Sequence, residues 1–92
     1  MDTTKIAEMV GQPAVWTRTD YHGQGWGTPV RIVGQKRIVY RVSAFFGEMA
    51  RVYVIVETAD GKRHRVKPHN VIANKAEAMW WHPESAREAF GE

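Results

Sequence analysis

RVYVIVETADGKRHRVKP, residues 51–68, predicts one β-hairpin whose two faces differ sharply in charge. Its centre, Ala59-Asp60-Gly61, suits a type I turn that ends with Gly61 in the left-handed conformation of a G1 bulge. A shorter, two-residue turn would place the valines of one strand beside the basic residues of the other and lose the buried face, so the bulged register is favoured. That register pairs Thr58 with Lys62, Val56 with His64, Val54 with Val66 and Tyr53 with Lys67.

The bulged register gives the hairpin one apolar face and one basic face, because successive side chains of a strand point to opposite sides. The apolar face contains Val52, Val54, Val56, His64 and Val66. On the other face, Glu57 lies directly across from Arg63 as an opposite-charge pair, beside Tyr53 and Ile55. The basic residues of this face are Arg63, Arg65 and Lys67, and neighbouring strands add Arg31, Lys36, Arg37 and Arg41 to a candidate basic surface.

The composition is that of a small folded protein with a modest excess of positive charge. The chain has 92 residues, of which 43% are hydrophobic and 25% are charged, and its formal net charge is +3. These values suit one globular domain and permit a polyanionic partner. The absence of cysteine excludes disulfides, thiol catalysis and thiolate zinc sites and favours a reducing compartment. Because no apolar run has the length of a signal peptide or a membrane span, we expect a single cytoplasmic domain, residues 1–92, without membrane contact.

Alternating sequence outside the hairpin predicts further strands, which are expected at residues 14–19, 28–34 and 36–43. Residues 20–27, which contain three glycines together with Tyr21 and Trp26, are expected to form a loop. After the hairpin, residues 68–72 suit one 3₁₀-like turn that plugs the end of the core. The central part of the chain is therefore expected to be mainly β.

Helices are expected at the two ends of the chain. Apolar residues at helical spacing predict a short N-terminal helix in residues 1–12. These residues are Ile6, Met9 and Val10. In the tail, residues 73–92, Asn74 followed by Glu77 predicts the start of one helix, and Pro83 suits the first position of a second.

The order of these elements resembles that of SH3-like small β-barrels, the group that contains Tudor, chromo-like and KOW-type modules. The resemblance covers residues 13–72. It rests on the strand order, the loop Tyr21-His22-Gly23-Gln24-Gly25-Trp26-Gly27, the Asp60-Gly61 turn and the closing segment Val66-Lys67-Pro68-His69-Asn70-Val71. It implies a five-stranded small barrel between the N-terminal helix and the helical tail, with a groove beside the first long loop that binds peptides, modified side chains or nucleic acid.

The first candidate function is nucleic-acid binding through the basic face. Arginine and lysine spaced along a surface meet phosphate oxygens, while exposed aromatic rings stack on unpaired bases. The alternative is that these cations only solvate an open sheet face or protect a sheet edge. The residues expected at a nucleic-acid site are Arg63, Arg65, Lys67, Arg37, Arg41, Tyr53 and Trp26.

The second candidate function is protein binding, as in the compact inhibitors or adaptors of phages and mobile elements. Trp80 and Trp81 are adjacent on an expected helix, where neighbouring side chains point about 100° apart, so one ring is left for a partner. A second copy of the chain would be the simplest partner. The alternative is that the tail wraps the barrel and both rings cover it. The residues expected at a protein interface are Tyr21, Trp26, Met79, Trp80 and Trp81.

Catalytic, metal and cofactor motifs are missing from the sequence. The histidines, at positions 22, 64, 69 and 82, lack metal-ligand spacing, and no carboxylate pair accompanies them. His64 lies on the valine face, where a hydrogen-bonded core or rim histidine is expected. Ser43 and Ser85 lack the glycine-flanked turn of a nucleophile. The sequence therefore predicts a non-enzymatic binding module that uses neither metal nor cofactor.

Overall fold

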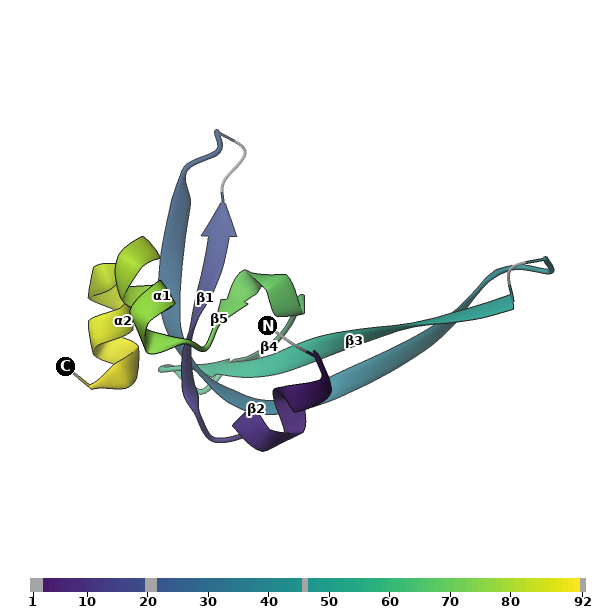
Figure 1. Cartoon of the computed structure of the whole chain (residues 1–92), viewed down its shortest axis with the longest axis horizontal. Helices are drawn as coiled ribbons and strands as arrows, with labels where there is room; N and C mark the ends of the chain where they lie inside the picture. The colour runs from purple at the N-terminus through teal and green to yellow at the C-terminus, as the bar shows by residue number, and fades with distance from the viewer. Residues whose placement is uncertain (1–2, 20–21, 46, 92) are drawn as a thin grey trace.

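The computed structural model describes residues 3–19, 22–45 and 47–91, and these are mainly β. One antiparallel sheet has the strand order β4-β3-β2-β1-β5 (Figure 1). Its strands are β1 (Pro13–Thr19), β2 (Gly25–Ser43), β3 (Gly47–Thr58), β4 (Arg63–Val66) and β5 (Val71–Ile72). The helices are the 3₁₀ helices η1 (Thr3–Met9) and η2 (Pro68–Asn70) and the α-helices α1 (Lys75–Trp81) and α2 (Pro83–Phe90).

The β3–β4 hairpin has the predicted register. Val54 pairs with Val66 and Val56 pairs with His64. Gly61 has φ +83°, and the Thr58 N–H donates to the Lys62 carbonyl at 2.9 Å, which confirms the bulged turn. The predicted ion pair also forms, with 3.1 Å between Arg63 Nε and Glu57 Oε2.

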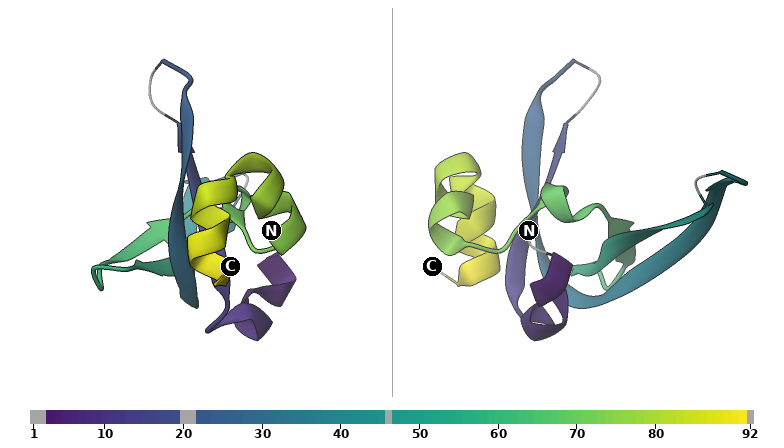
Figure 2. Two further views of the ribbon diagram at one scale, coloured as in Figure 1. Left: turned by 90° about the vertical axis from the view of Figure 1, so that its left-hand side faces the viewer. Right: turned by 45° about the vertical axis from the view of Figure 1, so that its right-hand side comes forward.

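Strand β2 belongs to two hairpins. It pairs with β1 as far as Arg31, and from Val30 to Ser43 it pairs with β3, with a register shift at Val33. The two hairpins project from the core in different directions (Figures 1 and 2). Two separate strands were predicted at residues 28–34 and 36–43, with a loop before them. That division is wrong, because Gly34 and Gln35 remain paired with β3 and residues 25–27 remain paired with β1.

Buried side chains form two clusters on the two sides of β1. The first lies within the bend of the sheet and contains Ile6, Ala14, Val30, Ile32, Val54, Val56, Val66 and Val71. The second lies between the sheet and the tail helices and contains Val15, Ile72, Ala78 and Ala86. The adjacent residues Ala14 and Val15 are both fully buried because β1 is covered on both faces.

The helical tail begins where the sequence predicts. Asn74 Oδ1 accepts a hydrogen bond of 3.0 Å from the Glu77 N–H at the start of α1, and Pro83 is the first residue of α2. The 3₁₀ turn before the tail is shorter than expected. It ends at Asn70, and the next two residues form β5, in which Ile72 pairs with Val15 of β1.

The N-terminal segment forms a 3₁₀ helix in which Ile6 is fully buried and Met9 is half-buried. Val10 was expected on the apolar face of this helix but lies beyond its end and is exposed. The edge strands β4 and β5 do not pair with each other within residues 3–19, 22–45 and 47–91, so the sheet is open. In the same residues no helix is long and apolar enough to cross a membrane.

Candidate nucleic-acid interface

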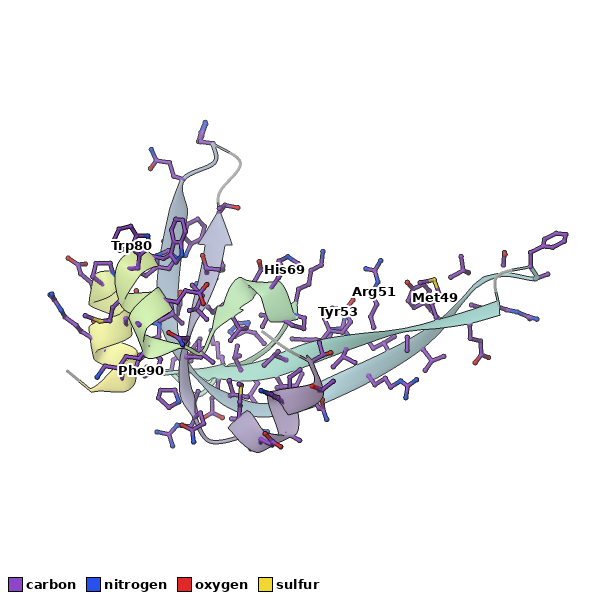
Figure 3. All side chains as sticks on the ribbon, viewed as in Figure 1. Met49, Arg51, Tyr53, His69, Trp80 and Phe90 are labelled. Carbon is purple, nitrogen blue, oxygen red and sulfur yellow. The ribbon has the colours of Figure 1, made fainter. Side chains whose placement is uncertain are left out.

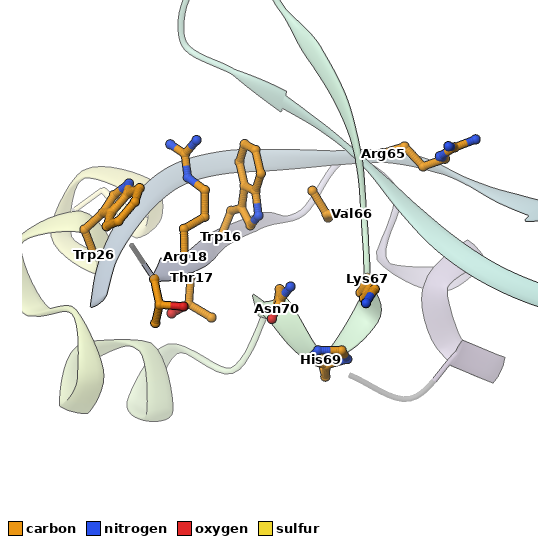
Figure 4. Close-up of a pocket in the computed structure, with 10 residues that line it drawn as sticks. Trp16, Thr17, Arg18, Trp26, Arg65, Val66, Lys67, His69 and Asn70 are labelled. Atoms are coloured by element: carbon orange, nitrogen blue, oxygen red, sulfur yellow. The ribbon is translucent and has the colours of Figure 1, made fainter. Parts of the chain in front are cut away.

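A groove lies on the inner face of the β1–β2 hairpin, where the hairpin extends beyond the first core cluster (Figure 4). The cross-strand pairs Trp16 with Thr28 and Arg18 with Trp26 place these four side chains on one face. The end of β4 and helix η2 form the opposite wall. The groove has a volume of about 550 Å³ and is lined by Trp16, Thr17, Arg18, Thr19, Trp26, Arg65, Val66, Lys67, His69 and Asn70.

Arg18 lies over two tryptophan rings of this face. Its Cζ is 4.0 Å from the ring centroid of Trp16 and 5.4 Å from that of Trp26. Nη2 donates to Thr28 Oγ1 at 2.7 Å, whereas Nε is buried and has no hydrogen-bond partner among the described residues. A buried donor left unpaired costs about 1–3 kcal/mol.

Trp16 lies between the groove and the β3–β4 hairpin. Its ring centroid is 4.9 Å from that of His64, so the histidine of the valine face reaches the rim of the groove. Neither Trp16 nor Arg18 was predicted at a binding site. The available signal was their alternation with Thr17 in β1, which places both on the same face.

The groove is cationic. Arg18, Arg65, Lys67 and His69 line it, and no aspartate or glutamate stands among the described lining residues. Trp26, which also lines the groove, is 42% exposed. Cations that meet phosphates and an exposed ring that stacks on a base are the two elements of single-strand recognition.

The tail helices hold the β1–β2 hairpin from its outer face. Thr17 Oγ1 and His82 Nε2 are 2.9 Å apart and share a hydrogen bond. Ser85 Oγ donates to the Gly27 carbonyl at 2.7 Å. These bonds, together with the second core cluster, fix the strand that carries Trp16 and Arg18.

Known proteins supply no match: no family model, curated protein or solved structure is similar to the chain. Within the described part of the chain, no three histidine, aspartate or glutamate side chains gather as metal ligands would. Function is therefore inferred from the groove and from the surfaces around it.

The structure brings together some of the residues predicted to bind nucleic acid. Trp26 and Lys67 line the groove, and Arg65 stands at its edge with its side chain directed away from Trp16 and Trp26 (Figure 4). The Tyr53 ring centroid is 5.0 Å from Arg65 Cζ. Arg63 lies on the outer face in its ion pair with Glu57.

The predicted basic surface is divided between two faces of the sheet. Arg37 pairs with Val52 and Arg41 with Glu48, whereas Tyr53 pairs with Lys36. Because directly paired residues share a face, Arg37 and Arg41 lie on the face opposite Tyr53.

The residues predicted at a protein interface also separate. Trp80 is 79% exposed and Trp81 is 62% exposed, so neither ring covers the sheet. Met79 packs against the second core cluster instead, and Trp26 belongs to the groove. Tyr21 lies outside the described residues.

Proposed function

We propose that the chain is a non-enzymatic module that binds nucleic acid in the groove beneath the β1–β2 hairpin. Phosphates contact Lys67 in the groove and Arg65 at its edge, and an unpaired base stacks on Trp26. The observation that supports this proposal most directly is the combination of cations and tryptophan rings without an acidic residue among the described lining. Favourable phosphate contacts and base stacking both require such a surface.

We also infer that the fold is an open relative of the SH3-like barrels. Three features support the inference: the strand order, the bulged β3–β4 turn, and a 3₁₀ turn immediately before β5. The groove lies next to the connection of β1 and β2, where the resemblance places the ligand site. Fold alone does not specify a ligand, so the proposed function depends on the groove residues.

The test is the salt dependence of binding to a labelled single-stranded oligonucleotide, measured by fluorescence anisotropy. Each phosphate contact contributes about 0.7 to the slope of log K against log salt for single strands, so R65A/K67A should reduce the slope by about 1.4. The matched control is K5A/R87A, which removes two exposed cations that do not line the groove. Failure of the wild-type protein to bind at low salt, or equal slopes for the two variants, would refute the proposal.

A second candidate function, self-association, is favoured by the exposed rings of Trp80 and Trp81 on α1. Exposed tryptophans are frequent anchors of protein interfaces, and removing such an anchor weakens binding by about 2 kcal/mol or more. Sedimentation equilibrium should then show a dimer that dissociates in W80A/W81A and persists in R65A/K67A. A wild-type protein that stays monomeric would exclude this candidate.

A further inference from the structure

The far part of the β2–β3 hairpin forms an arm, defined here as residues 35–45 and 47–52. Strand β1 pairs with β2 only as far as Arg31, and β4 pairs with β3 only from Val54 to Glu57. Both edges of the arm are therefore unpaired within the described residues. The arm extends along the longest dimension of the molecule, whose principal extents are 50 × 33 × 25 Å (Figures 1 and 2).

The arm contains the whole net charge of the chain. Its four basic residues and one acidic residue give a formal charge of +3, which equals the formal charge of all 92 residues. The remaining basic and acidic residues balance each other. The basic residues of the arm are Lys36, Arg37, Arg41 and Arg51, and its acidic residue is Glu48.

The cations of the arm lie on both of its faces. The cross-strand pairs place Lys36 and Arg51 on one face and Arg37 and Arg41 on the other. Arg51 is held in position because its Nε donates to the Tyr40 hydroxyl at 3.2 Å, and its Cζ lies 5.5 Å from the Tyr40 ring centroid. A partner that presents negative charge along two sides would meet both sets.

The arm also exposes apolar side chains. Phe45, near the tip, is 97% exposed, and Val39, Val42 and Met49 are exposed along the strands. A two-stranded ribbon without a third strand or a packed face is marginally stable in water, so contact with a partner would stabilise it. A second arm is a poor partner because it carries the same charge of +3.

We propose that the arm binds duplex DNA by lying in the major groove, with its cations on phosphates and Phe45 against a thymine methyl group. This proposal rests on the proposed nucleic-acid function and adds a second contact surface to it. The major groove of B-DNA is about 12 Å wide and admits a two-stranded β-ribbon, and phenylalanine is a suitable apolar contact for the thymine methyl. The major groove of duplex RNA is too narrow and deep for such an approach.

The arm and the groove are continuous. Lys67 and His69 line the groove, and they also line a second hollow with Arg51 and Tyr53 at the base of the arm. Figure 3 shows His69, Tyr53, Arg51 and Met49 in succession along one side of the molecule. A strand that leaves a duplex held by the arm would therefore pass directly towards the groove, and a duplex with a single-stranded tail would engage both surfaces.

Anisotropy titrations test the arm with a single-stranded oligonucleotide, blunt duplex DNA, duplex DNA with a single-stranded tail, and duplex RNA of the same sequence. For duplex DNA each phosphate contact contributes about 0.9 to the salt slope, so R37A/R41A should lower the slope by about 1.8 and leave single-strand binding unchanged. K5A/R87A is again the charge-matched control. We expect the tailed duplex to bind more tightly than either the single strand or the blunt duplex.

The contact of Phe45 has its own test, because uracil differs from thymine by the methyl group alone. Replacing thymine by uracil in the duplex should weaken binding of the wild-type protein and leave F45A unaffected. The protein could bind single strands while its duplex binding is unaffected by R37A/R41A. That result would overturn the arm proposal and leave the groove function standing. Duplex RNA bound as tightly as duplex DNA would also overturn it. Failure to bind any of the four would refute both proposals.

Discussion

Gly27 of β2 and His82 between the tail helices are so close that a β-carbon on Gly27 would stand 2.7 Å from His82 Cγ. The same atom would stand 2.8 Å from a methyl carbon of Val15. We therefore expect G27A to destabilise the protein by about 1–3 kcal/mol, as overpacking of a well-packed site usually does. Urea denaturation measures this change in the free energy of unfolding.

The control for that substitution is G34A in the same strand. A β-carbon on Gly34 would have no described atom within 4 Å, and this glycine does not adopt a left-handed φ. Its replacement should change the free energy of unfolding by at most about 1 kcal/mol. Equal losses in G27A and G34A would contradict the close packing of the tail against Gly27.

Removal of the Trp26 ring should weaken binding of a single-stranded oligonucleotide. Stacking of a base on an aromatic side chain contributes about 1–3 kcal/mol, so W26A should raise the dissociation constant between about 5-fold and 150-fold. W80A removes a more exposed tryptophan outside the groove and should leave oligonucleotide binding unchanged. If W80A weakens binding as much as W26A, the site has been assigned to the wrong surface.

The turn of the β3–β4 hairpin should show a local dependence on pH. The Thr58 hydroxyl, and secondarily the Lys62 N–H, donate to Asp60 and lower the pKa of its carboxyl below the ordinary 3.8. Because the pKa is depressed in the folded state, the stabilisation is complete above the ordinary pKa and disappears as the pH falls through the lowered value.

Replacing the Thr58 hydroxyl tests that cause. T58V should raise the pKa of Asp60 towards its ordinary value, which carboxyl-carbon NMR titration measures directly. D60N should make the unfolding free energy less sensitive to pH in the acid range. An Asp60 pKa that is the same in T58V and in the wild-type protein would show that the hydroxyl is not the main cause.

Helix η1 should contribute to stability through one residue. Ile6 is fully buried in the first core cluster, so I6A should cost about 2–5 kcal/mol. V10A alters an exposed neighbour and should stay within about 0.5 kcal/mol. Thermal denaturation distinguishes the two, and comparable losses would indicate that Val10 is also packed.

The β3–β4 hairpin was predictable because its determinants are local. The turn around Gly61 fixes the register, and the alternation of valines then fixes the buried face. The faces of the arm were not predictable in the same way. The register shift at Val33 reverses the alternation of β2, so Ile32 faces the core while Ile38 lies on the opposite side. Gly34 stands directly after the shift, and a glycine inside a strand often marks a bulge, but it does not specify which residue of β2 is left unpaired.

The groove was only partly predictable for a related reason. Trp26 was identified from the glycine-rich stretch around it, whereas Trp16 and Arg18 contribute through pairing across β1 and β2.

In the tail, the small residues Ala78 and Ala86 occupy the buried positions. The tail helices therefore contact the sheet closely, and Trp80 and Trp81 remain outside that contact. The spacing of apolar residues in the sequence did not reveal this arrangement.

The shared strand β2 has a consequence for how a protein of this kind can change over evolutionary time. In the described part of the chain, no buried core residue lies between Ile32 and Val54. Adding or removing one cross-strand pair near the tip would change the reach of the arm by about 3.3 Å and leave the core intact. Selection can thus alter the length of the arm without altering the fold that supports it.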